Sequence, residues 1–113
     1  MKSIQWVADS KKELDGVPSE VQRAIRTALF AAQVGRRAGY VKGMRGDLRG
    51  AMEIVTTDRA GTFRGIYYVG KELIYALHIF QKKSTHGIET PKRELDLIRR
   101  RLAWSRRQER EAG

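Results

Sequence analysis

The chain has 113 residues, 41% of them hydrophobic, which is enough for one domain with a modest core. It has no cysteine and only two histidines, which excludes a disulfide framework and the usual zinc sites, and we predict neither a metal nor a cofactor. The formal net charge is +10, and the whole excess falls in residues 36–49 and 81–107, so a polyanionic partner is indicated. No apolar stretch reaches the length of about 20 residues that a membrane span needs, and we expect a cytoplasmic protein.

The first third of the chain is predicted to be mainly helical. Residues Lys2–Ala8 have the character of a strand, and Ser10 and Glu13 have capping-box spacing for a short helix that ends at Asp15. A longer helix is predicted over Pro18–Val34, because its apolar residues recur at helical spacing. These residues are Val21, Ala24, Ile25, Ala28, Leu29 and Ala32.

Residues Arg36 to Gly50 are predicted to form a loop in which glycines alternate with cations. Glycine lets a backbone come close to a ligand, and clustered cations bind phosphates. The loop lacks the Gly-Lys-Ser/Thr order of a nucleotide-hydrolysing P-loop. We therefore expect it to follow a phosphate chain without hydrolysing a nucleotide.

Three β-rich runs follow, Met52–Thr57, Thr62–Val69 and Leu73–Gln81, and the tight turns between them predict an antiparallel meander. Arg64 lies in the middle run, where a guanidinium needs a partner, and that partner is either Glu53 or a phosphate. The last run contains one histidine, His78, and ends in two lysines, Lys82 and Lys83. A histidine within a strand is usually a hydrogen-bonded core residue. A strand that ends in lysines either continues into a solvated turn or positions these side chains for binding or catalysis.

A final helix is predicted over Pro91–Trp104, with Leu95, Ile98 and Leu102 as its apolar stripe. The charged tail Arg106–Gly113 is predicted to fray. The whole chain, residues 1–113, is then one α+β domain with an antiparallel sheet, two N-terminal helices and one C-terminal helix. We expect the two long helices on one side of the sheet and a concave basic face on the other.

Several motifs carry a resemblance to a known family. They are Gly61-Thr-Phe-Arg64 followed by Tyr67-Tyr68, and the run Phe80-x-Lys82-Lys83 that continues to Thr90-Pro91-x-x-Glu94. In these motifs and in the order of its elements, the chain resembles the RelE/ParE toxin superfamily, and within it the HigB-like, phage-derived branch. Many relatives carry a basic residue two positions after the residue that matches Glu53, and here that position is Val55.

The resemblance implies the toxin of a type II toxin–antitoxin system, a ribosome-dependent mRNA endonuclease that works without a metal. In such proteins the ribose 2′-OH attacks the scissile phosphate, and a partner antitoxin, often a helix-turn-helix protein, blocks the activity. The implied catalytic residues are Arg64, Lys82, Lys83, His78 and Tyr68. The implied RNA-binding residues are Arg36, Arg37, Lys42, Arg45, Arg49, Arg99 and Arg100.

Two other functions remain open at this stage. ParE-like relatives share the fold and inhibit gyrase without cutting RNA, and a simple nucleic-acid-binding protein would need only the positive charge. The convergence of Arg64 with Lys82 and Lys83 favours the nuclease, because binding alone requires no such convergence. Whether Arg64 and Lys82 share a face depends on the strand register, which the sequence does not determine.

Overall fold

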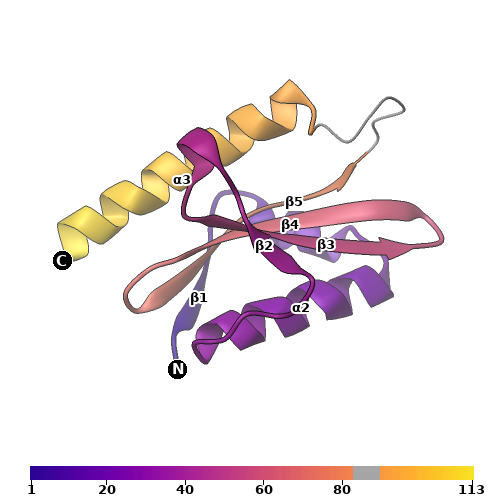
Figure 1. Ribbon diagram of the computed structural model, residues 1–113, viewed down its shortest axis with the longest axis horizontal. Helices are drawn as coiled ribbons and strands as arrows, with labels where there is room; N and C mark the ends of the chain where they lie inside the picture. Colours follow the sequence, from indigo (N-terminus) through magenta and orange to yellow (C-terminus); the bar gives the residue numbers. More distant parts are fainter. Residues whose placement is uncertain (83–89) are drawn as a thin grey trace.

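The computed structural model describes residues 1–82 and 90–113, and its centre is one five-stranded sheet in the order β1-β5-β4-β3-β2 (Figure 1). The sheet has helices on both faces, and this combination of sheet and helices confirms the predicted α+β class. The strands are β1 (Ser3–Trp6), β2 (Val41–Gly43), β3 (Ala51–Asp58), β4 (Gly61–Val69) and β5 (Leu73–Lys82).

The predicted meander is confirmed, since β3, β4 and β5 pair antiparallel in sequence order. The two edge strands differ from the prediction, β1 in its direction and β2, which is antiparallel to β3, in having been predicted as loop. β1 pairs in parallel with the first half of β5, from Ser3↔Leu73 to Trp6↔Ala76. β2 forms inside the predicted loop, because the buried side chain of Val41 anchors this segment opposite Ile54 of β3.

The helices cover opposite faces of the sheet, so the prediction that both lie on one side, with a free concave face opposite, is wrong (Figure 1). Both faces of β4 and β5 are apolar, and each therefore needs a cover. The helices are α1 (Ser10–Asp15), α2 (Ser19–Gln33) and α3 (Lys92–Ala112), with a short 3₁₀ turn, η1 (Gly46–Leu48).

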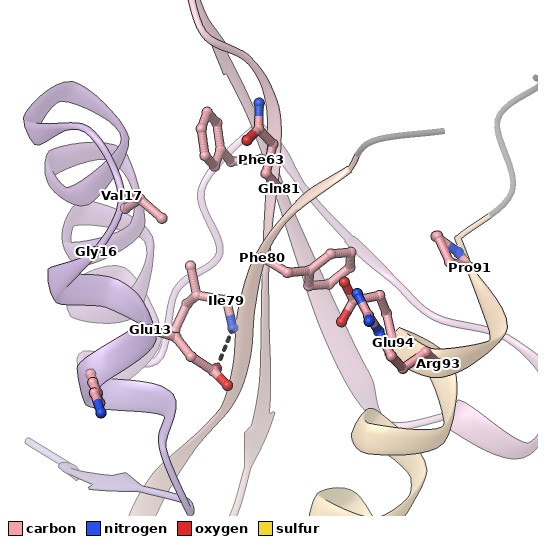
Figure 2. A pocket seen from close by; sticks show the side chains of 11 residues that line it. Glu13, Gly16, Val17, Phe63, Ile79, Phe80, Gln81, Pro91, Arg93 and Glu94 are labelled. Carbon is pink, nitrogen blue, oxygen red and sulfur yellow. Dashed lines mark hydrogen bonds between the residues drawn. The ribbon is translucent and has the colours of Figure 1, made fainter. Parts of the chain in front are cut away.

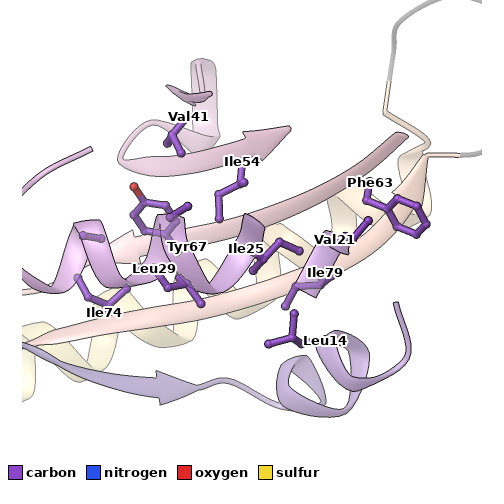
Figure 3. Packing of buried hydrophobic residues seen from close by; sticks show 12 residues of the cluster. Leu14, Val21, Ile25, Leu29, Val41, Ile54, Phe63, Tyr67, Ile74 and Ile79 are labelled. Carbon is purple, nitrogen blue, oxygen red and sulfur yellow. The ribbon is translucent and has the colours of Figure 1, made fainter. Parts of the chain in front are cut away.

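Two separate cores result from this arrangement. On one face the predicted stripe of α2 packs on Ile54, Tyr67 and Ile79, as Figure 3 shows, and these residues are nearly inaccessible to solvent. On the other face Ile98 and Leu102 of α3 are buried in a second cluster that also contains Ile66, Leu77 and Phe80 of β4 and β5. Both apolar stripes are thus confirmed as core, although they belong to different layers.

α3 continues to Ala112, well beyond the predicted end at Trp104, so the segment predicted to fray is helical. The carboxylate of Glu109 accounts for this, because it ties the end of the helix to the β4–β5 turn. It accepts hydrogen bonds from the Lys71 backbone N–H at 2.8 Å and from the Tyr75 hydroxyl at 2.7 Å. None of the helices in the described part of the chain is long and apolar enough to cross a membrane.

Candidate functional site

A cleft of about 710 Å³ opens where β2 and the preceding loop approach the segment before α3. Its floor is formed by Glu53 of β3 and Arg64 of β4, the middle strand of the sheet. Its remaining lining residues include three cations from the glycine-rich segment and a residue just before α3. We call it the cationic cleft and define it by Arg37, Lys42, Arg45, Glu53, Arg64 and Thr90.

Arg64 is held at the floor of the cationic cleft by a carboxylate. Its Nη1 lies 2.9 Å from Oε2 of Glu53, and the two side chains are only 13% and 8% exposed. Lys42 Nζ lies 3.7 Å from the other oxygen of Glu53. Of the two partners that the sequence left open for Arg64, the structure therefore contains Glu53.

The guanidinium of Arg64 is not saturated by this contact. Its Nε is buried and has no hydrogen-bond partner, and within the described residues Glu53 is the only group that accepts a hydrogen bond from it. A buried donor without a partner is costly, and such groups are uncommon in native structures. The arginine is thus fixed by one contact and retains donors for an anionic ligand.

The register resolves the relation between Arg64 and Lys82. Arg64 lies opposite Phe80, and Lys82 lies opposite Thr62, so Arg64 and Lys82 are diagonal neighbours on the same face. Such neighbours have their backbones about 7–8 Å apart, which lets long side chains meet one ligand. Lys83, the second predicted lysine, lies outside the described residues.

This shared face depends on an irregularity in β5. The pairing passes from Ile66↔His78 to Tyr67↔Ala76, which leaves Leu77 as an extra, bulged residue. Tyr75 and Leu77 therefore point to the α3 core from one side of the bulge, and Phe80 does so from the other. After the bulge, His78, Phe80 and Lys82 have the same orientation as Arg64.

His78 lies outside the cationic cleft, in a buried charged cluster that joins α1, β5 and α3. Its Nδ1 is 2.9 Å from a Glu13 oxygen and its Nε2 is 2.8 Å from a Glu94 oxygen. Arg101 completes the cluster, since its Nη1 lies 3.0 Å from Glu13 and 2.9 Å from the Leu77 carbonyl. Both ring nitrogens are occupied and the residue is 4% exposed, so His78 is placed to hold elements together rather than to touch a substrate.

Glu13 is the main acceptor of this cluster, as Figure 2 shows for its bond to Ile79. Burial alone would raise the pKa of Glu13, but hydrogen bonds from His78 and the Ile79 backbone N–H outweigh burial, and its pKa is lowered. The capping-box prediction did not anticipate this role, because the Glu13 side chain crosses to β5 and does not turn back to its own helix.

Tyr68 lies far from the cleft. It follows Arg64 by four residues in the same strand, which places their backbones about 13 Å apart. It packs beside Tyr75, with ring centroids 5.9 Å apart, on the core that α3 covers. The structure thus does not bring Tyr68 to the candidate site.

The predicted RNA-binding cations divide into three groups. Arg37, Lys42 and Arg45 line the cationic cleft. Arg99 is engaged with Asp47 at 2.6 Å and Asp96 at 2.9 Å, and it joins α3 to η1. Arg36, Arg49 and Arg100 are exposed and are not among the residues that line the cleft. The sequence did not single out Thr90 as part of the cleft, nor Glu13, Glu94 and Arg101 as partners in the buried cluster around His78.

A basic cleft over a central-strand arginine, on a sheet with helices on both faces, defines the architecture of a small α+β protein. A chain in the crystal structure of the toxin–antitoxin complex RelBE2 from Mycobacterium tuberculosis has the same fold, with a TM-score of 0.50 and 17% identity. That match covers 71% of this chain and 96% of the other.

The chain belongs to the family of phage-derived Gp49-like proteins, whose family model matches residues 12–103. Together with the fold, this confirms the resemblance to the RelE/ParE superfamily and its phage-derived branch. A comparison with curated proteins gave no significant match.

Proposed function

We propose that this protein is the toxin of a type II toxin–antitoxin pair and acts in the cytoplasm as a ribosome-dependent mRNA endonuclease. The observation that carries the proposal is Arg64, a nearly buried arginine held on the floor of a cleft that three further cations line. A polar group is rarely fixed in a central strand and left with spare donors unless a ligand uses them.

The proposed reaction is an internal phosphoryl transfer. The 2′-oxygen of a ribose forms a bond to phosphorus, the bond to the 5′-oxygen of the next nucleotide breaks, and one proton moves from the 2′-OH to solvent or a base while another reaches the 5′-oxygen. Negative charge spreads over the phosphate oxygens in the transition state, so fixed cations accelerate the step. Arg64 and Lys82 would stabilise that charge from neighbouring strands, with Glu53 positioning the guanidinium.

The remaining cleft cations would bind the RNA on either side of the scissile phosphate. Arg37, Lys42 and Arg45 come from the segment that the sequence predicted to follow a phosphate chain. Their contacts would be insensitive to base identity, because phosphate contacts position a nucleic acid without reading its sequence. Codon selection would then fall to other groups.

We also propose that a partner antitoxin, of the helix-turn-helix kind, covers this cleft with an acidic segment. The support is the family, together with a structural neighbour that was solved as a toxin–antitoxin complex. The association should weaken as salt rises, because it would depend on opposite charges at an exposed rim.

Induced expression with primer extension on a reporter message tests the activity. The wild-type protein should arrest growth and produce discrete message ends, and Arg64→Ala should lower cut-site abundance by at least about 10²-fold. Arg64→Lys should fail almost as badly, although it keeps a cation beside Glu53, because an ammonium cannot reproduce the guanidinium fork. The control is Arg23→Ala, which removes an exposed cation of α2 and should leave cleavage unchanged.

Thermal unfolding of each variant must accompany this assay, because Arg64→Ala leaves the Glu53 charge partly buried and without its main partner. Intact messages in arrested cells would refute the nuclease. If DNA supercoiling changed instead, the gyrase-inhibiting alternative would take its place. Unaltered cleavage by folded Arg64→Ala would remove Arg64 from the mechanism and leave it as the structural partner of Glu53.

A further inference from the structure

The outer face of α3 carries a straight line of arginines that the cationic cleft does not use. Arg93, Arg100 and Arg107 are exposed, and each follows the previous one by seven residues. Seven residues correspond to nearly two full helical turns, so the three side chains leave the helix in nearly the same direction. We call them the arginine stripe, and it extends over about 21 Å at 1.5 Å per residue.

These three arginines have no partner among residues 1–82 and 90–113. Neither Arg93 nor Arg100 nor Arg107 forms an ion pair with the described residues. Three of the four acidic residues of α3 are engaged elsewhere: Glu94 with His78, Asp96 with Lys92 and Arg99, and Glu109 with the β4–β5 turn. The outer face of the helix is therefore mainly positive, and its acidic residues are the paired Asp96, between Arg93 and Arg100, and Glu111 near the end.

The apolar surface of the same face lies mainly in a shallow groove between Arg93 and Arg100, where the half-buried Leu97 is part of the lining. The large exposed hydrophobic residues of the described chain are Met1, Phe30, Val34, Tyr40 and Val69, and none of them belongs to α3. A protein partner normally buries an apolar or aromatic centre, and in the lining of this groove only the half-buried Leu97 is apolar. Phosphate contacts need no such centre, because long cationic side chains and released counterions provide the affinity.

We infer that the arginine stripe is a second RNA-binding surface, which contacts the phosphate backbone of an RNA helix without regard to sequence. The choice of RNA as the polyanion rests on the proposed function, but the surface is independent of cleavage. Thr90, which lines the cationic cleft, precedes Arg93 by three residues, so the stripe starts close to the cleft along the chain. One RNA assembly could thus contact both sites, with the cleft holding the cut strand and the stripe holding structured RNA beside it.

Binding to a fully 2′-O-methylated RNA hairpin tests the inference, since that RNA cannot be cut through its 2′-oxygen. Fluorescence anisotropy with the full chain would compare wild type with Arg93→Gln/Arg100→Gln/Arg107→Gln over a range of KCl concentrations. The matched control, Lys12→Gln/Arg23→Gln/Arg59→Gln, removes three equally exposed cations that also lack ion pairs with the described residues.

We expect the stripe variant to bind at least about tenfold more weakly near 100 mM KCl, and the slope of log K against log salt to fall by about 2–3. The control should change the slope by less than about 1. Equal losses in the two variants would overturn the inference, since net charge alone would then account for binding. Loss of polyglutamate binding by the stripe variant with unchanged RNA binding would instead make the stripe a site for an acidic protein. Either result could occur while RNA cleavage stays intact. Failure of this inference is therefore distinguishable from failure of the proposed nuclease activity.

Discussion

Replacing Glu13 with glutamine should destabilise the protein far more than a surface charge change would. The Glu13 carboxylate accepts hydrogen bonds from His78 Nδ1 at 2.9 Å, from the Ile79 backbone N–H at 3.0 Å and from Arg101 Nη1 at 3.0 Å. Glutamine keeps one oxygen for Ile79 but removes the charge that balances His78 and Arg101. The variant should retain its fold, because the Leu14 core contacts of α1 are untouched.

The expected loss is about 2–3 kcal/mol. Removing one member of a buried ion pair typically costs about 3–5 kcal/mol, because the remaining charge is left uncompensated. The Glu13 side chain is 20% exposed, so water screens part of this cost. For a domain of this size, each kcal/mol shifts Tm by roughly 4 °C, which gives a decrease of roughly 8–12 °C.

Urea and thermal unfolding at pH 7 would measure this loss, with Asp15→Asn as the matched control. Asp15 lies in the same helix and pairs with Lys11 at 2.9 Å, but that pair is exposed and worth at most about 1 kcal/mol. If Glu13→Gln and Asp15→Asn lose the same stability, the buried cluster does not stabilise the fold and our reasoning is wrong.

The effect should also depend on pH in a defined direction. The pKa of Glu13 lies below its ordinary value of 4.5 in the folded protein, so the unfolded chain takes up its proton at higher pH. The stabilisation is therefore complete above about pH 4.5 and is lost as pH falls through the lowered pKa. The stability difference between wild type and Glu13→Gln should shrink in that acidic range.

Three further predictions concern packing and ionisation. Gly70→Ala should lower the folding stability by about 1–3 kcal/mol in urea unfolding, because a new Cβ would clash with the Glu109 carboxylate and lie 2.9 Å from the Tyr75 ring. The control Gly39→Ala should be nearly neutral, because a Cβ there meets nothing within 4 Å. Leu102→Ala should cost about 2–5 kcal/mol in the same assay, since Leu102 is 1% exposed, while the half-buried Leu97→Ala should cost clearly less. Burial and Glu109 raise the pKa of Tyr75 to about 12. The contribution of the Tyr75 hydroxyl to folding stability should therefore be complete below the ordinary tyrosine pKa near 10 and fall as pH rises toward 12. In an alkaline titration, Tyr75→Phe should remove the phenolate absorbance that appears last.

Most elements of this fold could be predicted from the sequence, because they carry a local periodic signal, whereas the short strand β2 carries none and was predicted as loop. The stripes of α2 and α3 and the alternation in β4 are properties of single segments, and the structure buries the expected residues. The side of the sheet on which each helix lies is not a property of a single segment. Since β4 and β5 are apolar on both faces, either helix could have covered either face.

The candidate site was only partly predictable, for the same reason. Arg64 stands out because a guanidinium in a central strand needs a partner, and Glu53 was one of two partners considered. The shared face of Arg64 and Lys82 depends on the bulge at Leu77, which no local pattern indicates. Glu13 lies 65 residues from its partner His78, and its spacing from Ser10 gave a helix-capping interpretation that concealed its contact with β5.

The parallel pairing of β1 with β5 constrains how this protein is made. Ser3 pairs with Leu73, so the first strand must wait until its neighbour has been translated, which takes roughly 4–14 s at 5–20 residues per second. α3, which covers the second core and fixes the turn at Lys71, follows all five strands in the chain and leaves the ribosome after them. The nascent chain consequently exposes one apolar face of its sheet until α3 has been made, and contacts between distant segments make its final collapse slow. A protein of this topology cannot complete its cleft until Thr90 has followed all five strands out of the ribosome.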